Sequence, residues 1–175
     1  MLCHDINLHF SESILQITTP GDNEFKHVWI ATEHNFFKFQ VQACADVHIA
    51  LTQYPGKADN MSYEIVIGAS NNSISHVKDP AKGAIVKEVK SPDVLSCTER
   101  RPFWIQFIYE SIWLGRGSEI GRQGFLIWTH PIRPISALSL ASASGYSATW
   151  EFNQQLGNDK CCTMLQSWDS YLKQV

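Results

Sequence analysis

The chain has 175 residues, of which 44% are hydrophobic, 11% aromatic and 18% charged, and its formal net charge is −3 at pH 7. This length fits one domain, and the combination of many aromatic and few charged residues excludes intrinsic disorder. The net charge provides no basic field for nucleic acid, and no apolar run approaches the about 20 residues that cross a bilayer, so we expect neither nucleic acid binding nor membrane insertion.

Apolar and polar residues alternate with a period of two along most of the chain, which predicts half-buried strands. The clearest runs are residues 37–42, 47–52, 63–67 and 103–109. Further strands are expected near residues 13–18, 25–31, 84–89, 111–114, 124–130, 135–141 and 146–152. Turn signals separate the runs at residues 54–60, 70–72, 109–111 and 115–118.

About ten short strands at this spacing predict an all-β fold, an antiparallel β-sandwich. The predicted elements do not alternate between strands and helices, so a doubly wound parallel sheet is not expected. Near the C-terminus, Leu165, Trp168 and Leu172 have helical spacing, which predicts a short helix that packs on the sandwich or forms a dimer contact. We expect one domain over residues 1–175.

Five cysteines occur without a CxxC pair or zinc-finger spacing, so no structural zinc site is expected. They are Cys3, Cys44, Cys97, Cys161 and Cys162. In a cytosolic protein they would be free thiols; in a secreted protein they would form two disulfides and leave one thiol to pair between chains. We favour the oxidised state, with Cys44 and Cys97 able to join strand edges. The sequons Asn60-Met61-Ser62 and Asn71-Asn72-Ser73 are compatible with secretion.

Searches for catalytic motifs find no dinucleotide loop, phosphate loop, nucleophile elbow or HExxH motif. The glycines between Gly115 and Gly121 lie between two β segments, so we expect them to permit positive φ angles in a hairpin. The histidines are scattered, and the acidic residues form no calcium loop. The sequence therefore predicts no catalytic constellation, no cofactor and no metal ion.

Short segments in a fixed order run through the middle of the chain. They are FQVQACADVHIAL (39–51), YEIVIG (63–68), NNS (71–73), VLSC (94–97), RPFWI (101–105), IWLGRG (112–117), FLIW (125–128) and WEF (150–152). Together they resemble the farnesoic acid O-methyltransferase-type domain over about residues 27–152. The resemblance implies a small β-rich module, used as an extracellular recognition domain and often appended to larger proteins. Some relatives lie beside repeats that bind mannose-type sugars.

The family name also implies a methyltransferase. Enzymes of the usual S-adenosylmethionine type need a glycine-rich strand-to-helix turn in a parallel sheet, and this chain shows neither part. We therefore do not expect that activity. A non-enzymatic structural or protein-interaction module is the other alternative.

Our leading hypothesis is a metal-independent lectin that recognises cell-surface glycans. Sugar recognition needs a flat aromatic face and bidentate hydrogen-bond partners, which sandwich loops present on a rigid scaffold. Trp113 alternates away from its apolar neighbours and precedes a polar loop, and an exposed tryptophan favours galactose-type sugars. The predicted ligand-binding residues are Trp113, Arg116, Glu119, Arg122 and Gln123, with a second surface at Asn72 and His76 and a third at residues 32–35.

Trp29, Trp128, Trp150 and Phe152 are instead expected in the core. We expect an extracellular protein that forms homo-oligomers, linked covalently if Cys3, Cys161 or Cys162 pairs between chains, since pairing weak sugar sites raises avidity.

Overall fold

The computed structural model describes residues 13–28, 35–54, 61–108 and 110–154. The chain separates into two compact units, one of residues 16–152 and one of residues 1–15 and 153–175. The first contains almost all of the described residues, and the account below concerns it. The predicted C-terminal helix lies outside the described residues, and the single-domain organisation stays a prediction.

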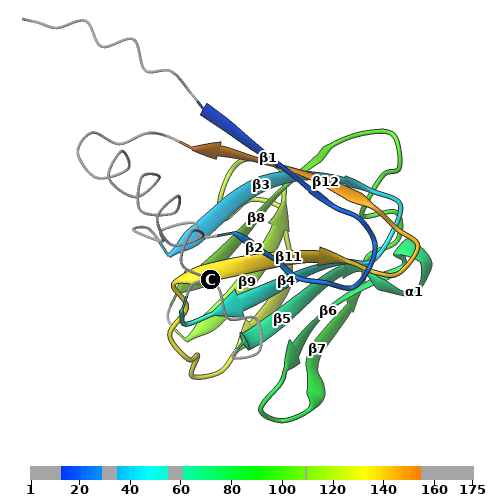
Figure 1. Ribbon diagram of the computed structural model, residues 1–175. Coiled ribbons are helices and arrows are strands. Elements are labelled where there is room, and N and C mark those ends of the chain that lie inside the picture. Colours follow the sequence, from blue (N-terminus) through cyan, green and yellow to red (C-terminus); the bar gives the residue numbers. More distant parts are fainter. Residues whose placement is uncertain (1–12, 29–34, 55–60, 109, 155–175) are drawn as a thin grey trace, which may run out of the picture. The chain divides into compact units, whose positions relative to one another are not determined.

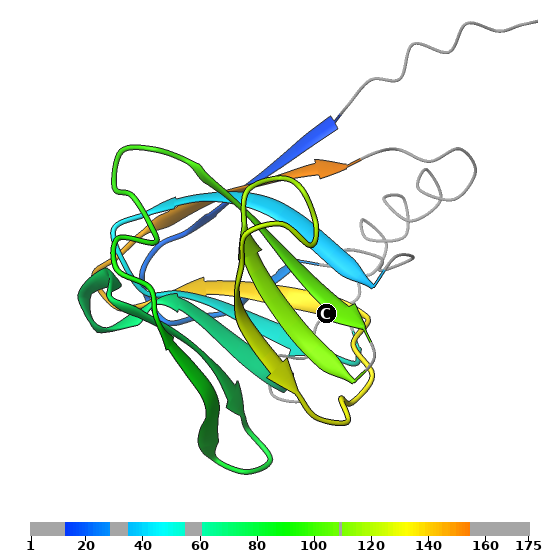
Figure 2. The same cartoon turned by 180° about the vertical axis from the view of Figure 1, so that it is seen from behind.

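The larger unit contains two six-stranded sheets. Sheet A has the order β1 (Ser13–Thr19), β12 (Ala148–Gln154), β3 (Phe36–Ala43), β8 (Arg101–Ile108), β9 (Ser111–Arg116) and β10 (Gly124–Thr129). Sheet B has the order β2 (Lys26–Val28), β11 (Ala137–Ser142), β4 (Val47–Thr52), β5 (Met61–Gly68), β6 (Ile74–Asp79) and β7 (Ala84–Lys90). Figures 1 and 2 show the sheets as two layers of this unit. The predicted antiparallel β-sandwich is confirmed.

The strands form where the sequence alternates, because successive side chains of a strand point to opposite faces. In β3, Phe37, Phe39 and Val41 are buried while the residues between them are half-buried or exposed. Phe39 packs against Phe103 of β8 and Trp150 of β12, each at 5.8 Å between ring centroids. The aromatic core therefore joins three strands of sheet A on its inner face.

The expected core tryptophans are confirmed where they are described. Trp150 is fully buried, Phe152 is 3% exposed and Trp128 is 8% exposed. Trp29 lies outside the described residues. The indole nitrogen of Trp150 donates to the buried hydroxyl of Thr19 at 3.1 Å, so this polar atom has a partner inside the core.

One strand, β6, has no counterpart among the predicted ones. Its inward positions include Ser75 and Asp79, and polar residues there hide the apolar alternation. The structure satisfies both: the Ser75 hydroxyl bonds that of Ser91 at 2.7 Å, and Asp79 accepts from Arg133 at 2.7 Å. Buried polar groups need such partners, and only the folded chain shows that they have them.

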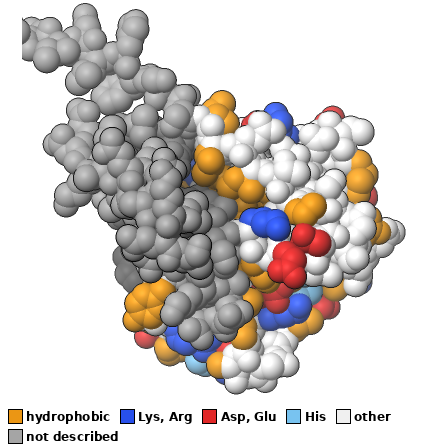
Figure 3. Space-filling view, viewed as in Figure 1, with side chains coloured by type: hydrophobic (Ala, Val, Ile, Leu, Met, Phe, Trp, Pro, Cys, Tyr) orange, Lys and Arg blue, Asp and Glu red, His pale blue; other side chains and the backbone are white. Residues whose placement is uncertain are grey.

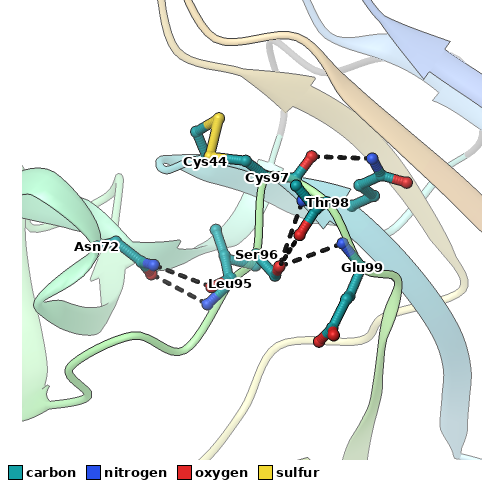
Figure 4. Close-up of a disulfide and its surroundings, with 8 residues drawn as sticks. Cys44, Asn72, Leu95, Ser96, Cys97, Thr98 and Glu99 are labelled. Atoms are coloured by element: carbon teal, nitrogen blue, oxygen red, sulfur yellow. Dashed lines mark hydrogen bonds between the residues drawn. A yellow bond between two sulfur atoms is a disulfide. The ribbon is translucent and has the colours of Figure 1, made fainter.

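The disulfide between Cys44 and Cys97 is present, across a sequence separation of 53 residues. It joins the turn after β3 to the segment before β8 (Figure 4). The expected pairing of these two cysteines is confirmed. Cys3, Cys161 and Cys162 lie outside the described residues.

Candidate functional site

The predicted loop site lies at one end of sheet A, between β9 and β10. Trp113 is half-buried on the outer face of β9, opposite Gln106 and Ile127, and its indole nitrogen donates to Ser111 at 2.7 Å. Ile127 is 41% exposed. Trp113 therefore does turn away from the core, as predicted.

The charged residues of this loop have few fixed contacts. Glu119 and Arg122 form an ion pair at 3.4 Å with both side chains 75% exposed, and such pairs contribute little to stability. Arg116 lies over the ring of Phe125 at 5.3 Å from its centroid, and its buried Nε has no hydrogen-bond partner among the described residues. Gln123 is exposed, with a φ of 50°. The predicted residues share one end of the sheet, but most of them are not preorganised.

Trp104, which the sequence did not single out, lies beneath this loop. It occupies an outward position of β8, yet it is fully buried. A Cβ at Gly115 would lie 2.2 Å from the indole, and the indole nitrogen donates to the carbonyl of Arg122 at 2.9 Å. Gly115 is thus needed for close packing and has no positive φ, in contrast to the expectation; Gly117 and Gly121 do have positive φ.

The second predicted surface divides into two places. Asn72 lies in the turn α1 (Ala69–Asn72) between β5 and β6, where its amide both donates to and accepts from the backbone of Leu95 at 3.0 Å. His76 lies on β6, opposite Val66 and Glu88 on the neighbouring strands. Asn72 therefore holds the 91–97 segment, whereas His76 belongs to the outer face of sheet B.

A charged cluster lies on that outer face, centred on Glu64 of β5. One carboxylate oxygen of Glu64 bonds His48 Nδ1 of β4 at 2.6 Å, and the other contacts Lys78 Nζ of β6 at 3.2 Å. We call His48, Glu64, Lys78 and His76 the outer-face cluster. Figure 3 shows acidic, basic and histidine side chains gathered on the described part of one face of the molecule.

Strand register produces this cluster. Glu64 lies directly opposite Lys78, and residues directly opposite on adjacent antiparallel strands share a face. His48 lies directly opposite Val66, which is two residues after Glu64 on the same face of β5. The His48 side chain therefore reaches Glu64 diagonally across the two strands. Three strands thus bring His48 and Lys78 into contact with the two oxygens of Glu64.

The surroundings also set the protonation of the cluster. Burial raises the pKa of the Glu64 carboxyl, but the hydrogen bond from His48 and the charge of Lys78 outweigh burial and bring the pKa below its ordinary value. Burial lowers the pKa of His76, and the nearby Lys78 charge lowers it further. At neutral pH the cluster thus combines an ionised carboxylate with a neutral His76 whose two ring nitrogens have no partner among the described residues.

A hollow of about 280 Å³ adjoins the cluster. Its lining combines Glu64 and Lys78 with apolar side chains, and Ile85 among them is 47% exposed. The lining residues are Met61, Glu64, Lys78, Asp79, Pro80, Gly83, Ala84 and Ile85. Apolar side chains make up most of this shallow hollow, and the charged groups of Glu64, Lys78 and Asp79 lie among them.

Asp79 anchors the rim of the hollow. Its side chain is only 3% exposed, bonds Arg133 at 2.7 Å and lies 3.9 Å from Lys82. Burial raises the pKa of Asp79, but the hydrogen bond and charge of Arg133 outweigh burial, so the net pKa is lowered. Arg133 also stacks over Tyr63 at 4.4 Å from the ring centroid. The part-exposed Arg133 therefore links Asp79 at the rim of the hollow to the core residue Tyr63.

The part of the chain that the structure describes contains no group of three metal-ligating His, Cys, Asp or Glu residues. No helix among the described residues is long and apolar enough to span a bilayer. The third predicted surface, residues 32–35, lies outside the described residues except for Asn35, which is exposed.

Of the predicted site residues, only His76 belongs to the cluster beside the hollow. His48, Glu64 and Lys78 are not among the predicted site residues, although His48 and Glu64 occupy polar positions of predicted strands and Lys78 lies on the unpredicted β6. Polar residues at alternate positions of three strands are the available signal. Without the pairing register that signal does not show that they meet.

Comparison with known proteins gives a match to the family model described as farnesoic acid O-methyltransferase, over residues 23–156. A curated relative, "Uncharacterized protein 5" of Haliotis asinina, is 29% identical over 107 residues, which are 61% of this chain and 61% of that protein. The chain thus spans about three fifths of the length of that relative.

Solved structures with a similar arrangement have very low sequence identity. Galectin LEC-6 of Caenorhabditis elegans is 9% identical, with a TM-score of 0.49, covering 79% of this chain and 95% of that one. Sheep galectin-11 is 8% identical, with a TM-score of 0.45, covering 74% and 98%. A prokaryotic β-1,3-1,4-glucanase derived from a mouse hindgut metagenome is 8% identical, with a TM-score of 0.47, covering 82% and 80%.

Proposed function

We propose that this chain, which belongs to the farnesoic acid O-methyltransferase family by its match over residues 23–156, is a carbohydrate-binding protein that binds glycans without a metal ion. The observation that carries the proposal is the position of Glu64, held by His48 and Lys78 at the edge of the 280 Å³ hollow.

The chemistry of the outer-face cluster suits sugar hydroxyls. An ionised carboxylate offers about four acceptor positions on its two oxygens, and His48 and Lys78 occupy one on each oxygen of Glu64. The remaining positions are free to accept from ligand hydroxyl groups, and hydrogen bonds to a charged acceptor are the stronger kind. Lys78, 38% exposed, donates in turn.

The apolar part of the hollow suits the other side of a sugar ring. Ile85, Pro80 and Met61 provide an apolar surface next to the charged groups. A pyranose presents C–H groups on one face and hydroxyls at its edge, so apolar contact and directed hydrogen bonds are satisfied together. Because Asp79 and Arg133 fix the rim, little ordering of the protein would oppose binding.

The loop of Trp113, Arg116, Glu119, Arg122 and Gln123 stays a predicted alternative position for the glycan. Binding there would have to order exposed side chains, at a cost of about 0.5–1.5 kcal/mol for each long side chain. The hollow is therefore our preferred position.

Glycan-array binding tests the function and the position together. We expect wild-type protein to bind a defined set of glycans, Glu64→Gln to bind them about tenfold more weakly, and Glu119→Ala to bind them as wild type does. Glu88→Gln is the matched control, since Glu88 is an exposed glutamate on β7 that does not line the hollow. Loss of binding in Glu119→Ala alone would move the site to the loop, and no binding by folded wild-type protein would exclude the lectin.

The family name supports a second candidate function, transfer of a methyl group. The usual cofactor of that reaction sits on a glycine-rich turn between a parallel strand and a helix. In the described part of this chain the neighbouring strands are antiparallel in both sheets, from β12 to β10 in sheet A and from β2 to β7 in sheet B. Isothermal titration with S-adenosylmethionine distinguishes the candidates. We expect no heat of binding, and saturable heat would favour the methyltransferase.

The Cys44–Cys97 disulfide supports secretion, because disulfides persist in oxidising compartments and are rare in the cytosol. The expected homo-oligomer would raise the avidity of weak sugar sites. Sedimentation measures the assembly, and a non-reducing gel shows whether Cys3, Cys161 or Cys162 links two chains.

A further inference from the structure

We propose that Asn71 is an N-glycosylation site, carrying an N-linked oligosaccharide at the turn between β5 and β6. The sequon Asn71-Asn72-Ser73 occupies this turn. Exposure of Asn71, the fixed geometry of its neighbours and the nearby disulfide together carry the proposal.

The turn is tightly built, but Asn71 points to its surface. Ser70, Asn71 and Asn72 have φ values of 53°, 59° and 59°, a left-handed conformation that asparagine tolerates better than most residues. The Ser73 backbone N–H donates to the Ala69 carbonyl at 3.0 Å and the Ser73 hydroxyl donates to the Ser70 carbonyl at 2.6 Å, and these two bonds close the turn. Asn71 itself is exposed.

The two adjacent asparagines differ in what their amides do. Asn72 is tied to Leu95 by two hydrogen bonds of 3.0 Å (Figure 4). The Asn71 amide makes no side-chain hydrogen bond within the described ranges of the chain, so its nitrogen is accessible. Two positions after Asn71 stands Ser73, which has a hydroxyl group, whereas two positions after Asn72 stands Ile74, which has none. The sequon therefore selects the accessible asparagine of the pair.

The disulfide indicates the compartment in which this modification occurs. Leu95 is two residues from Cys97, so the turn, the 91–97 segment and the Cys44–Cys97 bond are neighbours (Figure 4). Disulfides form in the oxidising lumen of the secretory pathway, and asparagine sequons of secreted proteins are modified on surface positions. A chain that acquires this disulfide there meets the glycosylation machinery as well.

The reaction needs a lipid-diphosphate-linked oligosaccharide and its transferase. The Asn71 Nδ2 forms a bond to the anomeric carbon of the first sugar, while the bond from that carbon to the diphosphate oxygen breaks. The lipid diphosphate leaves with the electron pair, and the amide nitrogen loses one proton to a base of the transferase. Nothing is oxidised or reduced.

The attached glycan would not cover the hollow. The hollow lies at Met61 and Asp79, the start of β5 and the end of β6, whereas Asn71 lies at the opposite end of this hairpin. Eight strand residues at about 3.4 Å each separate the two ends by roughly 25 Å. Modification at Asn71 and ligand binding in the hollow are therefore compatible.

Expression of the full chain through the secretory pathway of insect cells tests the proposal. The Asn60→Gln variant leaves Asn71 as the acceptor. We expect peptide-N-glycosidase to increase its gel mobility, and peptide mapping in heavy-oxygen water to show labelled Asp at position 71. Ser73→Thr should keep the glycan, whereas Ser73→Ala and Asn71→Gln should lose it.

The result that would contradict the proposal can be obtained with the Asn60→Gln protein, in which the turn of residues 69–73 is unchanged. If secreted Asn60→Gln protein contains the Cys44–Cys97 disulfide and yields only unmodified Asn71 in the peptide map, Asn71 is not a glycosylation site. The readout does not use ligand binding, so it is independent of the proposed lectin function.

Discussion

Two outward-facing residues, Trp104 on sheet A and Glu64 on sheet B, differ in what surrounds them. On sheet A, Trp104 is fully buried under the β9–β10 loop and contacts the backbone at Gly115. On sheet B, Glu64 is held by His48 and Lys78 beside an open hollow. The outward side chain of Trp104 is thus covered by packing, whereas that of Glu64 keeps hydrogen-bonding groups beside a hollow.

This difference shows that an aromatic residue at an outward position is not by itself a ligand platform. Trp104 stabilises its own loop, and its indole nitrogen is already bonded to the Arg122 carbonyl. The carboxylate of Glu64 retains acceptor capacity while its position is fixed. A candidate site is better recognised by polar groups that are fixed but not saturated.

The largest expected effect is at Trp104. Trp104→Ala removes a fully buried indole and should lower the free energy of unfolding by about 3–5 kcal/mol, the range for large-to-small core changes. Trp113→Ala is the matched control, since Trp113 is half-buried on the same face and should cost clearly less. Urea unfolding measures both. Equal losses would remove the contrast between the two tryptophans.

Gly115→Ala disturbs the same contact between Trp104 and the backbone of β9. The added Cβ would lie 2.2 Å from the Trp104 ring, so the ring or strand must move. We expect a loss of about 1–3 kcal/mol, as for other overpacked sites. Gly121→Ala provides the comparison, since its Cβ would meet nothing within 4 Å and only its φ of +81° is strained. A stable Gly115→Ala protein would mean that Trp104 can leave its position freely.

Beside the hollow, Glu64→Gln keeps the shape of the side chain but removes its charge. We expect glycan affinity to fall about tenfold, equivalent to about 1.4 kcal/mol, because hydrogen bonds to the acceptor weaken. Titration calorimetry with a glycan found on the array measures the change, and Glu88→Gln should bind as wild type. Unchanged affinity in Glu64→Gln would show that the hollow is not the site.

The smallest expected effect is a loss of folding stability in mild acid. The folded protein lowers the pKa of His76, so the unfolded chain takes up the proton more readily, and stability should fall as pH drops below the ordinary histidine value of about 6.5. Lys78, Glu64, Glu88 and His48 are the charged or titratable groups around it.

For one proton, the free energy of unfolding changes by at most about 1.4 kcal/mol per pH unit. Denaturant unfolding of wild type and His76→Gln between pH 7 and pH 5 measures it, with the shallower profile expected in the variant. Parallel profiles would assign the acid sensitivity to another group. The lowered pKa values of Glu64 and Asp79 act only at lower pH, where stability is lost as their carboxylates become protonated.

Local pattern was sufficient for most of the fold. Alternation in β3 and β8 predicted their inner faces, and Trp150 and Phe152 are buried as expected. The sandwich follows because strands with one apolar face must bury it against another layer. β6 was not predicted because the inward residues Ser75 and Asp79 are polar and break the alternation. Their hydrogen-bond partners, Ser91 and Arg133, lie far along the chain.

The candidate site depended on information that is not local. His48 and Glu64 are 16 residues apart, and Lys78 follows 14 residues later. Only antiparallel register brings them together. In the predicted loop the residue types were visible, but their exposure and lack of fixed partners were not.

The sequence by itself determined the class of fold, the described strands other than β6 and the burial of Trp128 and Trp150, because each follows from the period of two or from composition. It identified Cys44 and Cys97 as able to pair but left the connectivity of the five cysteines open. The tertiary structure decided which outward residues remain available. It placed Trp104 beneath a loop and Glu64 beside a hollow, because burial of an outward side chain depends on what the rest of the chain lays over it.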